Sequence, residues 1–177
     1  MKAILRKHPE LDFFIGFLGG PTVPTKQDKF KPIIADKVTI TKGDVTELLE
    51  DGLDLYVKKR EINSLKEFEE KFKKQITKEL KEYHPYPLEQ KLEVVIFVSM
   101  TEKRLKQVDI DNLTKSILDC FTGTVFEDDS QVVNIFASKE VNEVVALNGL
   151  VVGIRKIDKM EDSWFKNIKL AHFEYKE

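Results

Sequence analysis

The sequence predicts an α+β fold in which a long helix and a shorter helix pack on one small mixed β-sheet. Apolar residues recur at helical spacing for five turns after Ser64. Two apolar stretches, residues 11–18 and 92–100, are rich in β-branched and aromatic residues and are typical of buried strands. A second helical pattern between Asp109 and Gly123 precedes another β-prone stretch. Helices between strands of this kind build a layer of helices on a sheet.

The composition indicates one soluble globular domain over residues 1–177, with 41% hydrophobic and 34% charged residues. The single cysteine, Cys120, excludes an internal disulfide and fits a reducing compartment. No secretory signal is visible, and residues 13–20 are too short to cross a membrane. We therefore expect a cytoplasmic protein with no membrane partner and no small-molecule cofactor.

The N-terminal third begins with the strand predicted for residues 11–18, which Gly19-Gly20-Pro21 ends. Residues 22–31 are rich in Pro, Thr and Lys, and we expect a loop there. In residues 32–61 the pattern predicts short strands over 38–40 and 53–57 with a brief helix over 44–50.

The long helix is the clearest element of the sequence. Ser64 and Glu67 form the spacing of a capping box at its start, and Pro85 and Pro87 follow its end. Lysine and glutamate cover one face, which we expect to be solvated. The other face is apolar and consists of Leu65, Phe68, Phe72, Ile76, Leu80 and Tyr83.

The C-terminal third is expected to add strands to the sheet. Residues 144–157 form another strand or half of a hairpin, and the β-prone residues 132–137 are its expected partner. The tail from Glu161 to Glu177 contains several apolar residues and is expected to form a C-terminal helix or an arm that covers the sheet or joins a subunit contact.

Four acidic residues gather around the second helix. Asp109 and Asp111 stand at its start, where side-chain oxygens and the helix dipole favour negative charge. Asp128 and Asp129 follow the turn at Gly123. If the strand after this turn packs against the helix start, Asp109, Asp111 and Asp129 converge.

Converging carboxylates need a counter-charge. Two of them about 4 Å apart repel by roughly 4 kcal/mol at an effective dielectric constant near 20. A hard cation, Mg²⁺ or Mn²⁺, relieves this repulsion and keeps open positions for a phosphate. Lys115, one turn after Asp111, adds a positive charge on the same face. The alternative interpretation is ordinary helix capping with an Asp111–Lys115 ion pair.

A family resemblance distinguishes these interpretations. The run Asp-Ile-Asp-Asn-Leu-Thr-Lys from Asp109, then Leu-Asp at 118–119, then Asp-Asp-Ser-Gln-Val from Asp128, resembles the signature of the RusA family of Holliday junction resolvases. The resemblance implies a RusA-like fold with a catalytic helix after Asp109. It also implies a homodimer that nicks two opposed strands of a four-way DNA junction. Because RusA-like proteins are often carried by phages, the resemblance also favours a phage or prophage origin. The insertion relative to the family is expected at residues 32–61.

The resemblance also implies roles for single residues. Asp109, Asp111 and Asp129 match acids that bind Mg²⁺ or Mn²⁺, and Lys115 matches an essential lysine. Asp128 and Asn112 match supporting residues.

The net charge of −2 is unusual for a DNA-binding protein, since DNA is a polyanion. Local charge must therefore make the contact, and a bound cation would neutralise part of the acidic cluster. The basic loop before Asp109 is the main candidate. The candidate DNA-binding residues are Lys103, Arg104 and Lys106 in that loop, together with Lys26, Lys29 and Lys139.

Three alternatives stay open. The protein is a metal-dependent nuclease for other branched DNA such as forks and flaps, or it binds junctions without cutting them. In the third alternative the acids only cap helices and form ion pairs, and the protein does not act on nucleic acid.

Overall fold

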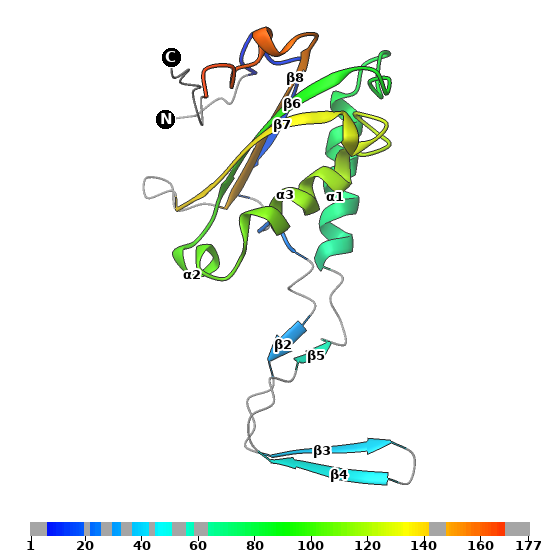
Figure 1. Ribbon diagram of the computed structural model, residues 1–177, viewed down its shortest axis with the longest axis vertical. Helices are drawn as coiled ribbons and strands as arrows, with labels where there is room; N and C mark the ends of the chain where they lie inside the picture. The colour runs from blue at the N-terminus through cyan, green and yellow to red at the C-terminus, as the bar shows by residue number, and fades with distance from the viewer. Residues whose placement is uncertain are drawn as a thin grey trace, which may run out of the picture.

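The computed structural model describes residues 7–19, 22–25, 30–32, 37–42, 45–50, 56–58, 64–141 and 148–168. Its centre is a four-stranded mixed sheet in the order β1-β8-β6-β7 (Figure 1). The strands β6 and β7 are parallel, and the other two pairs are antiparallel. The predicted α+β class with a small mixed sheet is confirmed. The strands are β1 (Phe13–Leu18), β6 (Lys91–Ser99), β7 (Val132–Glu140) and β8 (Gly149–Ile157).

The helices α1 (Ser64–Glu79) and α3 (Ile110–Phe121) pack on one face of this sheet, and the short helix α2 (Glu102–Leu105) lies between β6 and α3. α1 begins at Ser64, as predicted, and buries Phe68, Phe72 and Ile76 against the strands. Tyr83, which was predicted on the same apolar face, lies beyond the end of α1 and is 54% exposed.

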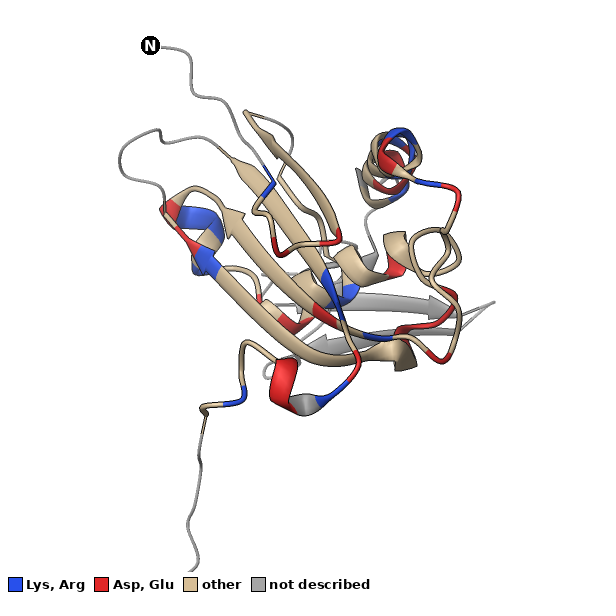
Figure 2. Ribbon diagram, turned by 90° about the horizontal axis from the view of Figure 1, so that it is seen from above, with Lys and Arg blue, Asp and Glu red and all other residues tan. Residues whose placement is uncertain are grey.

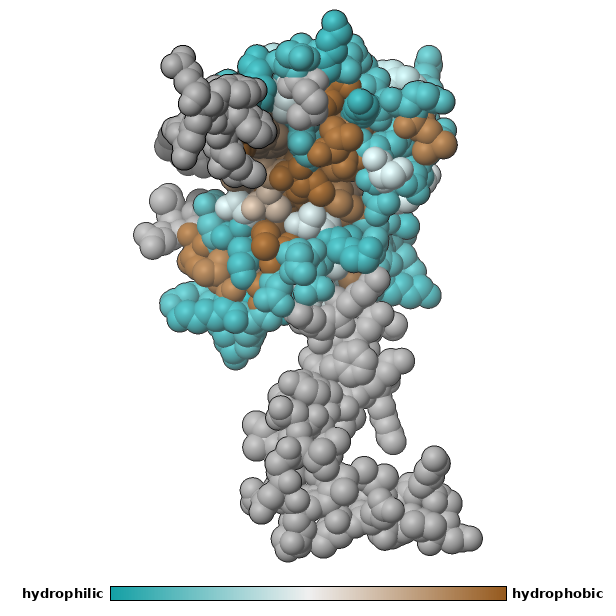
Figure 3. Space-filling view, in the orientation of Figure 1, coloured by the Kyte–Doolittle hydropathy of each residue, from teal (hydrophilic) through white to brown (hydrophobic). Residues whose placement is uncertain are grey.

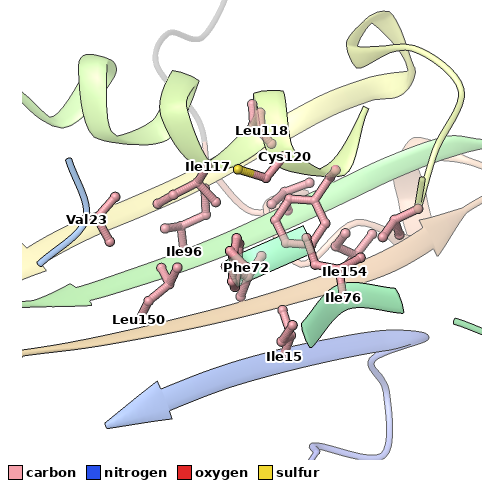
Figure 4. Packing of buried hydrophobic residues seen from close by; sticks show 14 of the residues in the cluster. Ile15, Val23, Phe72, Ile76, Ile96, Ile117, Leu118, Cys120, Leu150 and Ile154 are labelled. Atoms are coloured by element: carbon pink, nitrogen blue, oxygen red, sulfur yellow. The ribbon is translucent and has the colours of Figure 1, made fainter. Parts of the chain in front are cut away.

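The core forms where alternate residues of β6 meet both helices (Figure 4). Side chains of a strand alternate between the two faces of its sheet, so one face of β6 is apolar throughout. Val94, Ile96 and Val98 lie opposite Ile154, Val152 and Leu150 of β8. α3 contributes its own apolar stripe, Leu113, Ile117, Cys120 and Phe121, all of which are buried.

The predicted pairing of residues 144–157 with residues 132–137 is wrong. β8 pairs with β6 and β1, and β7 pairs with β6. β6 is apolar enough to occupy the centre of the sheet, and α3 provides the long connection that a parallel neighbour requires. Residues 142–147 lie outside the described residues.

The predicted helix over residues 44–50 is also wrong. This segment forms β4 (Val45–Glu50), which is antiparallel to β3 (Lys37–Lys42) with Val38 opposite Leu49. A neighbouring pair joins β2 (Phe30–Pro32) to β5 (Tyr56–Lys58). β-branched residues at 45 and 46 favour a strand once a partner strand is available, which outweighs the local helical spacing.

The C-terminal segment covers part of the face of the sheet that carries no helix. Of the two positions expected for this tail, covering the sheet or joining a subunit contact, its described residues occupy the first. After the 3₁₀ turn η3 (Met160–Asp162), Ser163 Oγ and the Trp164 amide donate to the buried carboxylate of Glu93. Phe165 stacks on Phe136 of β7 with 6.4 Å between ring centroids. Residues 161–168 contain no α-helix, and residues 169–177 lie outside the described part.

We predict that the Cys120 thiol is inert in the folded protein. Burial raises its pKa to about 12, and its Sγ donates to the Ser116 carbonyl at 3.3 Å. Thiol reagents react with the thiolate, so labelling at pH 8 should require unfolding. Labelling rates measured along a urea titration should follow the unfolding curve. Rapid labelling of the native protein would contradict this buried position.

Candidate functional site

The first pair of acids lies at the start of α3. Asp109 is the N-cap residue, with extended backbone angles, and its carbonyl accepts the first helical hydrogen bond from Leu113 at 3.1 Å. Its side chain makes no capping hydrogen bond. Asp109 and Asp111 are both exposed. Simple capping therefore does not account for the Asp109 carboxylate.

Buried and half-buried contacts fix this end of α3. Lys139 of β7 donates from its ammonium group to the carbonyls of Leu105 and Val108, directly before Asp109. Val108 is itself buried. Arg104 donates to the Val23 carbonyl at 3.2 Å. Lys139 and Arg104, both predicted as DNA-binding residues, thus also hold the loop that carries Asp109 in place.

Lys115 projects from the next turn of α3. Its Nζ lies 3.7 Å from Asp119, and 59% of its side chain is exposed. The sequence had suggested Asp111 as the partner, whereas the structure pairs Lys115 with the acid one turn further on. An exposed pair of this kind contributes little to stability, so Lys115 can turn towards a phosphate at little cost. Asn112 is half-buried beside it.

The second pair of acids lies in a tight turn before β7. Asp128 caps the 3₁₀ turn η2 (Asp129–Gln131) and accepts from the Ser130 amide at 2.9 Å. Hydrogen bonds from Ser130 lower the pKa of Asp128. Asp129 begins the turn and is exposed. Both carboxylates therefore face solvent on a defined backbone.

Gln131 holds this turn, a role that the sequence reasoning missed. Its Oε1 accepts from the amides of Glu127 and Asp128 at 2.8 and 3.0 Å. Its Nε2 donates to the carbonyls of Tyr86, Pro87 and Gln90. Only 3% of the residue is exposed. The spacing Asp-x-x-Gln, which is that of a capping box, was the signal available in the sequence.

One chain places the two acidic pairs at opposite ends of α3 (Figure 1). Asp109 follows the carboxyl end of β6, and Asp129 precedes the amino end of the parallel strand β7. A helix of this length spans about 18 Å. Within the described residues, no three His, Cys, Asp or Glu side chains lie close enough to hold a metal. The expected convergence does not occur inside a single chain.

The basic loop is only partly free for DNA. Lys106 pairs with Glu102 at 2.6 Å, and Lys103 is exposed. Lys26 and Lys29 lie outside the described residues. Figure 2 shows blue and red residues interspersed over the described part of the chain rather than separated into two faces. A contact with DNA must therefore come from small groups of cations.

The comparison with protein families identifies the class of protein. The family model of endodeoxyribonuclease RusA matches residues 52–155, which is more than half of the chain and includes α1, β6, α3 and β7. The chain belongs to the RusA family. RusA proteins are metal-dependent nucleases that act on DNA, so this chain is a nuclease whose partner is DNA. No curated protein matches the sequence. Of the helices in the described segments, none has the length and apolar run that a membrane crossing needs.

We predict that Gln131→Ala destabilises the turn that carries Asp129. The substitution leaves two amides and three carbonyls without their side-chain partner, which typically costs about 1–3 kcal/mol per buried unsatisfied group. Urea unfolding should show a loss of at least about 2 kcal/mol. Gln107→Ala, at an exposed position before α3, is the matched control and should change stability by less than about 0.5 kcal/mol. Equal stability of the two variants would contradict the role of Gln131.

Proposed function

We propose that this RusA-family nuclease resolves four-way DNA junctions by paired symmetric nicks, that it requires Mg²⁺ or Mn²⁺, and that it acts as a homodimer. The observation that carries the proposal is the placement of Asp109, Asp111 and Asp129 as exposed carboxylates on rigid elements. Oxygen ligands of this kind suit a hard divalent cation. Two identical sites in a dimer suit two opposed strands of a symmetric junction.

A second copy of the chain completes the ligand set. β7 is an edge strand of the described sheet, and it carries the exposed apolar residues Val133, Ile135 and Phe136. Figure 3 shows an apolar patch on the face that β7 crosses. Exposed apolar residues on an unpaired edge favour association with another strand.

A two-fold axis near the middle of β7 then assembles two sites. Such an axis places the start of one β7 beside the end of the other. The end of β7 contacts the loop before Asp109 through Lys139, and the start of β7 follows Asp129. Each site therefore takes Asp109 and Asp111 from one copy and Asp129 from the other. This arrangement accounts for the observation that no three acids converge among the described residues of a single chain.

The residues have distinct roles in phosphodiester hydrolysis. The chemistry that a hard divalent cation supplies in such a site is activation of a water molecule and charge relief on the phosphate. Asp109, Asp111 and Asp129 hold the ligand positions, and Asp128 and Gln131 keep the Asp129 backbone in place. Lys115, whose side chain is largely exposed, supplies positive charge where negative charge develops on the phosphate oxygens. Lys103 contributes a further cation for the DNA backbone.

We predict that Asp111→Asn abolishes junction cleavage and preserves or strengthens junction binding. The variant loses one negative charge, which in the wild type both attracts the cation and repels the DNA. Cleavage of a four-way junction, a fork and a linear duplex should be compared with Mg²⁺ and with EDTA. Asp158→Asn, at an exposed site after β8, is the charge-matched control and should cut like the wild type. Cutting by Asp111→Asn at the wild-type rate would contradict the metal site, and equal cutting of the fork would favour wider branched-DNA activity.

We predict that Asp111→Asn and Asp129→Asn chains, each inactive alone, restore nicking when mixed. If each site takes residues from two copies, the mixed dimer has one site with both defects and one site with none. It should therefore nick one strand of the junction without resolving it. If each site lay within one chain, every site in the mixture would carry a defect and no nicking would return. The double variant mixed with wild type, at the same total concentration, is the control for subunit exchange.

A further inference from the structure

An exposed aromatic residue at the end of α1 is backed by two others. Tyr83, which is 54% exposed, stacks on Tyr86 with 5.8 Å between ring centroids and 19° between ring planes. The ring of His84 lies 4.6 Å from each of these two tyrosines. Tyr86 is 2% exposed, so the cluster rests on the core. We call Tyr83, His84 and Tyr86 the Tyr83 cluster.

A cavity of about 660 Å³ opens beside this cluster, between α1 and the outer edge of β1. Tyr83 and His84 form part of its wall, together with Lys7, Lys78 and Lys81. Its volume is in the range of cavities that bind small molecules or a nucleotide. An exposed aromatic face beside a cavity with several lysines is a common way to bind single-stranded nucleic acid.

The acids of the cavity wall are partly neutralised. Asp12 lines the cavity, but Lys156 lies 3.6 Å from its carboxylate, and the Lys156 amide donates to it at 2.7 Å. The same Lys156 ammonium lies 5.9 Å from the centroids of both Tyr83 and Tyr86. Glu79 is the other acid of the wall. The cations therefore outnumber the acids around the Tyr83 cluster.

His84 adds a hydrogen-bond donor that the described structure does not use. Its Nδ1 accepts from the Lys81 amide at 2.8 Å, which leaves the ring proton on Nε2. Nε2 is shielded from solvent and has no hydrogen-bond partner among the described residues. Burial lowers the pKa of His84, so the ring is neutral at pH 7. The described structure therefore leaves one buried donor of the Tyr83 cluster unsatisfied.

The Tyr83 cluster is joined to the turn that carries Asp129. The Tyr86 amide donates to Val125 at 2.8 Å, and Gln131 donates to the carbonyls of Tyr86 and Pro87. These bonds fix the position of the Tyr83 cluster relative to the turn that carries Asp129.

We propose that the Tyr83 cluster and the lysines of the adjacent cavity bind an unpaired nucleotide at the branch point of the DNA, with its base stacked on Tyr83 and its phosphates near Lys78 and Lys81. This inference rests on the proposed function, since the branch point belongs to the substrate proposed there. The bases of a four-way junction are paired, so the protein must open a base pair at the crossover. Stacking is interrupted at the crossover, which makes extrusion of a base cheaper there than inside a continuous duplex.

The test measures junction binding in an Asp111→Asn background, which prevents cutting. Tyr83→Ala should raise the Kd for the junction about tenfold, whereas Tyr83→Phe, which keeps the ring, should stay within about twofold. Leu88→Ala, at another exposed apolar residue outside the cavity, is the control. Lys81→Ala should lower the slope of log Kd against log salt by about one, and Lys66→Ala on the exposed face of α1 is its control.

The position of the base is tested with 2-aminopurine, a fluorescent adenine analogue, placed at and next to the crossover. Binding should quench its fluorescence at one position, and Tyr83→Ala should remove the quenching. Unchanged Kd and fluorescence for Tyr83→Ala, in a protein whose Asp111→Asn form still binds junctions, would overturn this inference and leave the proposed function intact. Failure of the Asp111→Asn protein itself to bind junctions would overturn both.

Discussion

The parallel pairing of β6 with β7 is the constraint on which the site depends. Because the two strands run in the same direction, the chain must return along the sheet, and α3 makes that return. The acids at the two ends of α3 are thereby separated by the length of the helix. The same topology leaves β7 at the edge of the described sheet, with apolar residues exposed. One connection thus separates the acidic pairs and also leaves the edge through which, in the proposed dimer, a second copy joins them.

Two polar side chains hold the backbone beside the acids in a fixed position relative to the sheet. Lys139 fixes the loop before Asp109 from the end of β7, and Gln131 fixes the turn before the start of β7. Both satisfy backbone carbonyls that would otherwise be costly to bury. A site on loops alone would lose the geometry that hydrolysis needs, since small misplacements reduce rates strongly. Here Lys139 anchors the first acidic pair to β7, and Gln131 anchors the second pair to the segment that leads into β6.

Most elements, and the positions of the acids beside α3, could be predicted from the sequence, whereas the partners of the strands could not. The role of these acids as metal ligands stays a prediction. Periodicity located α1, α3 and β6 because each buries one apolar face. The local sequence pattern predicted a helix over residues 44–50, because such a pattern cannot show that a partner strand lies opposite. It also gave the wrong neighbour for β8, since β-prone segments do not encode which of several strands they join. The sequence could not predict that Asp109 and Asp129 lie apart, because their separation also depends on which strands pair.

The exposure of the acids bears on how the proposed dimer and its cation depend on each other. In one chain the two pairs are far apart and solvated, so folding does not have to overcome their mutual repulsion. Repulsion arises only when a second copy brings Asp129 towards Asp109 and Asp111. In the proposed dimer, a divalent cation that binds this assembled set would stabilise the dimer by mass action, because Asp109 and Asp129 lie apart in the separate chains. Cation binding and dimer formation should therefore strengthen each other by the same free energy. A net charge of −2 is compatible with DNA binding in the proposed dimer, since bound cations would neutralise acids at the place where the phosphate must approach.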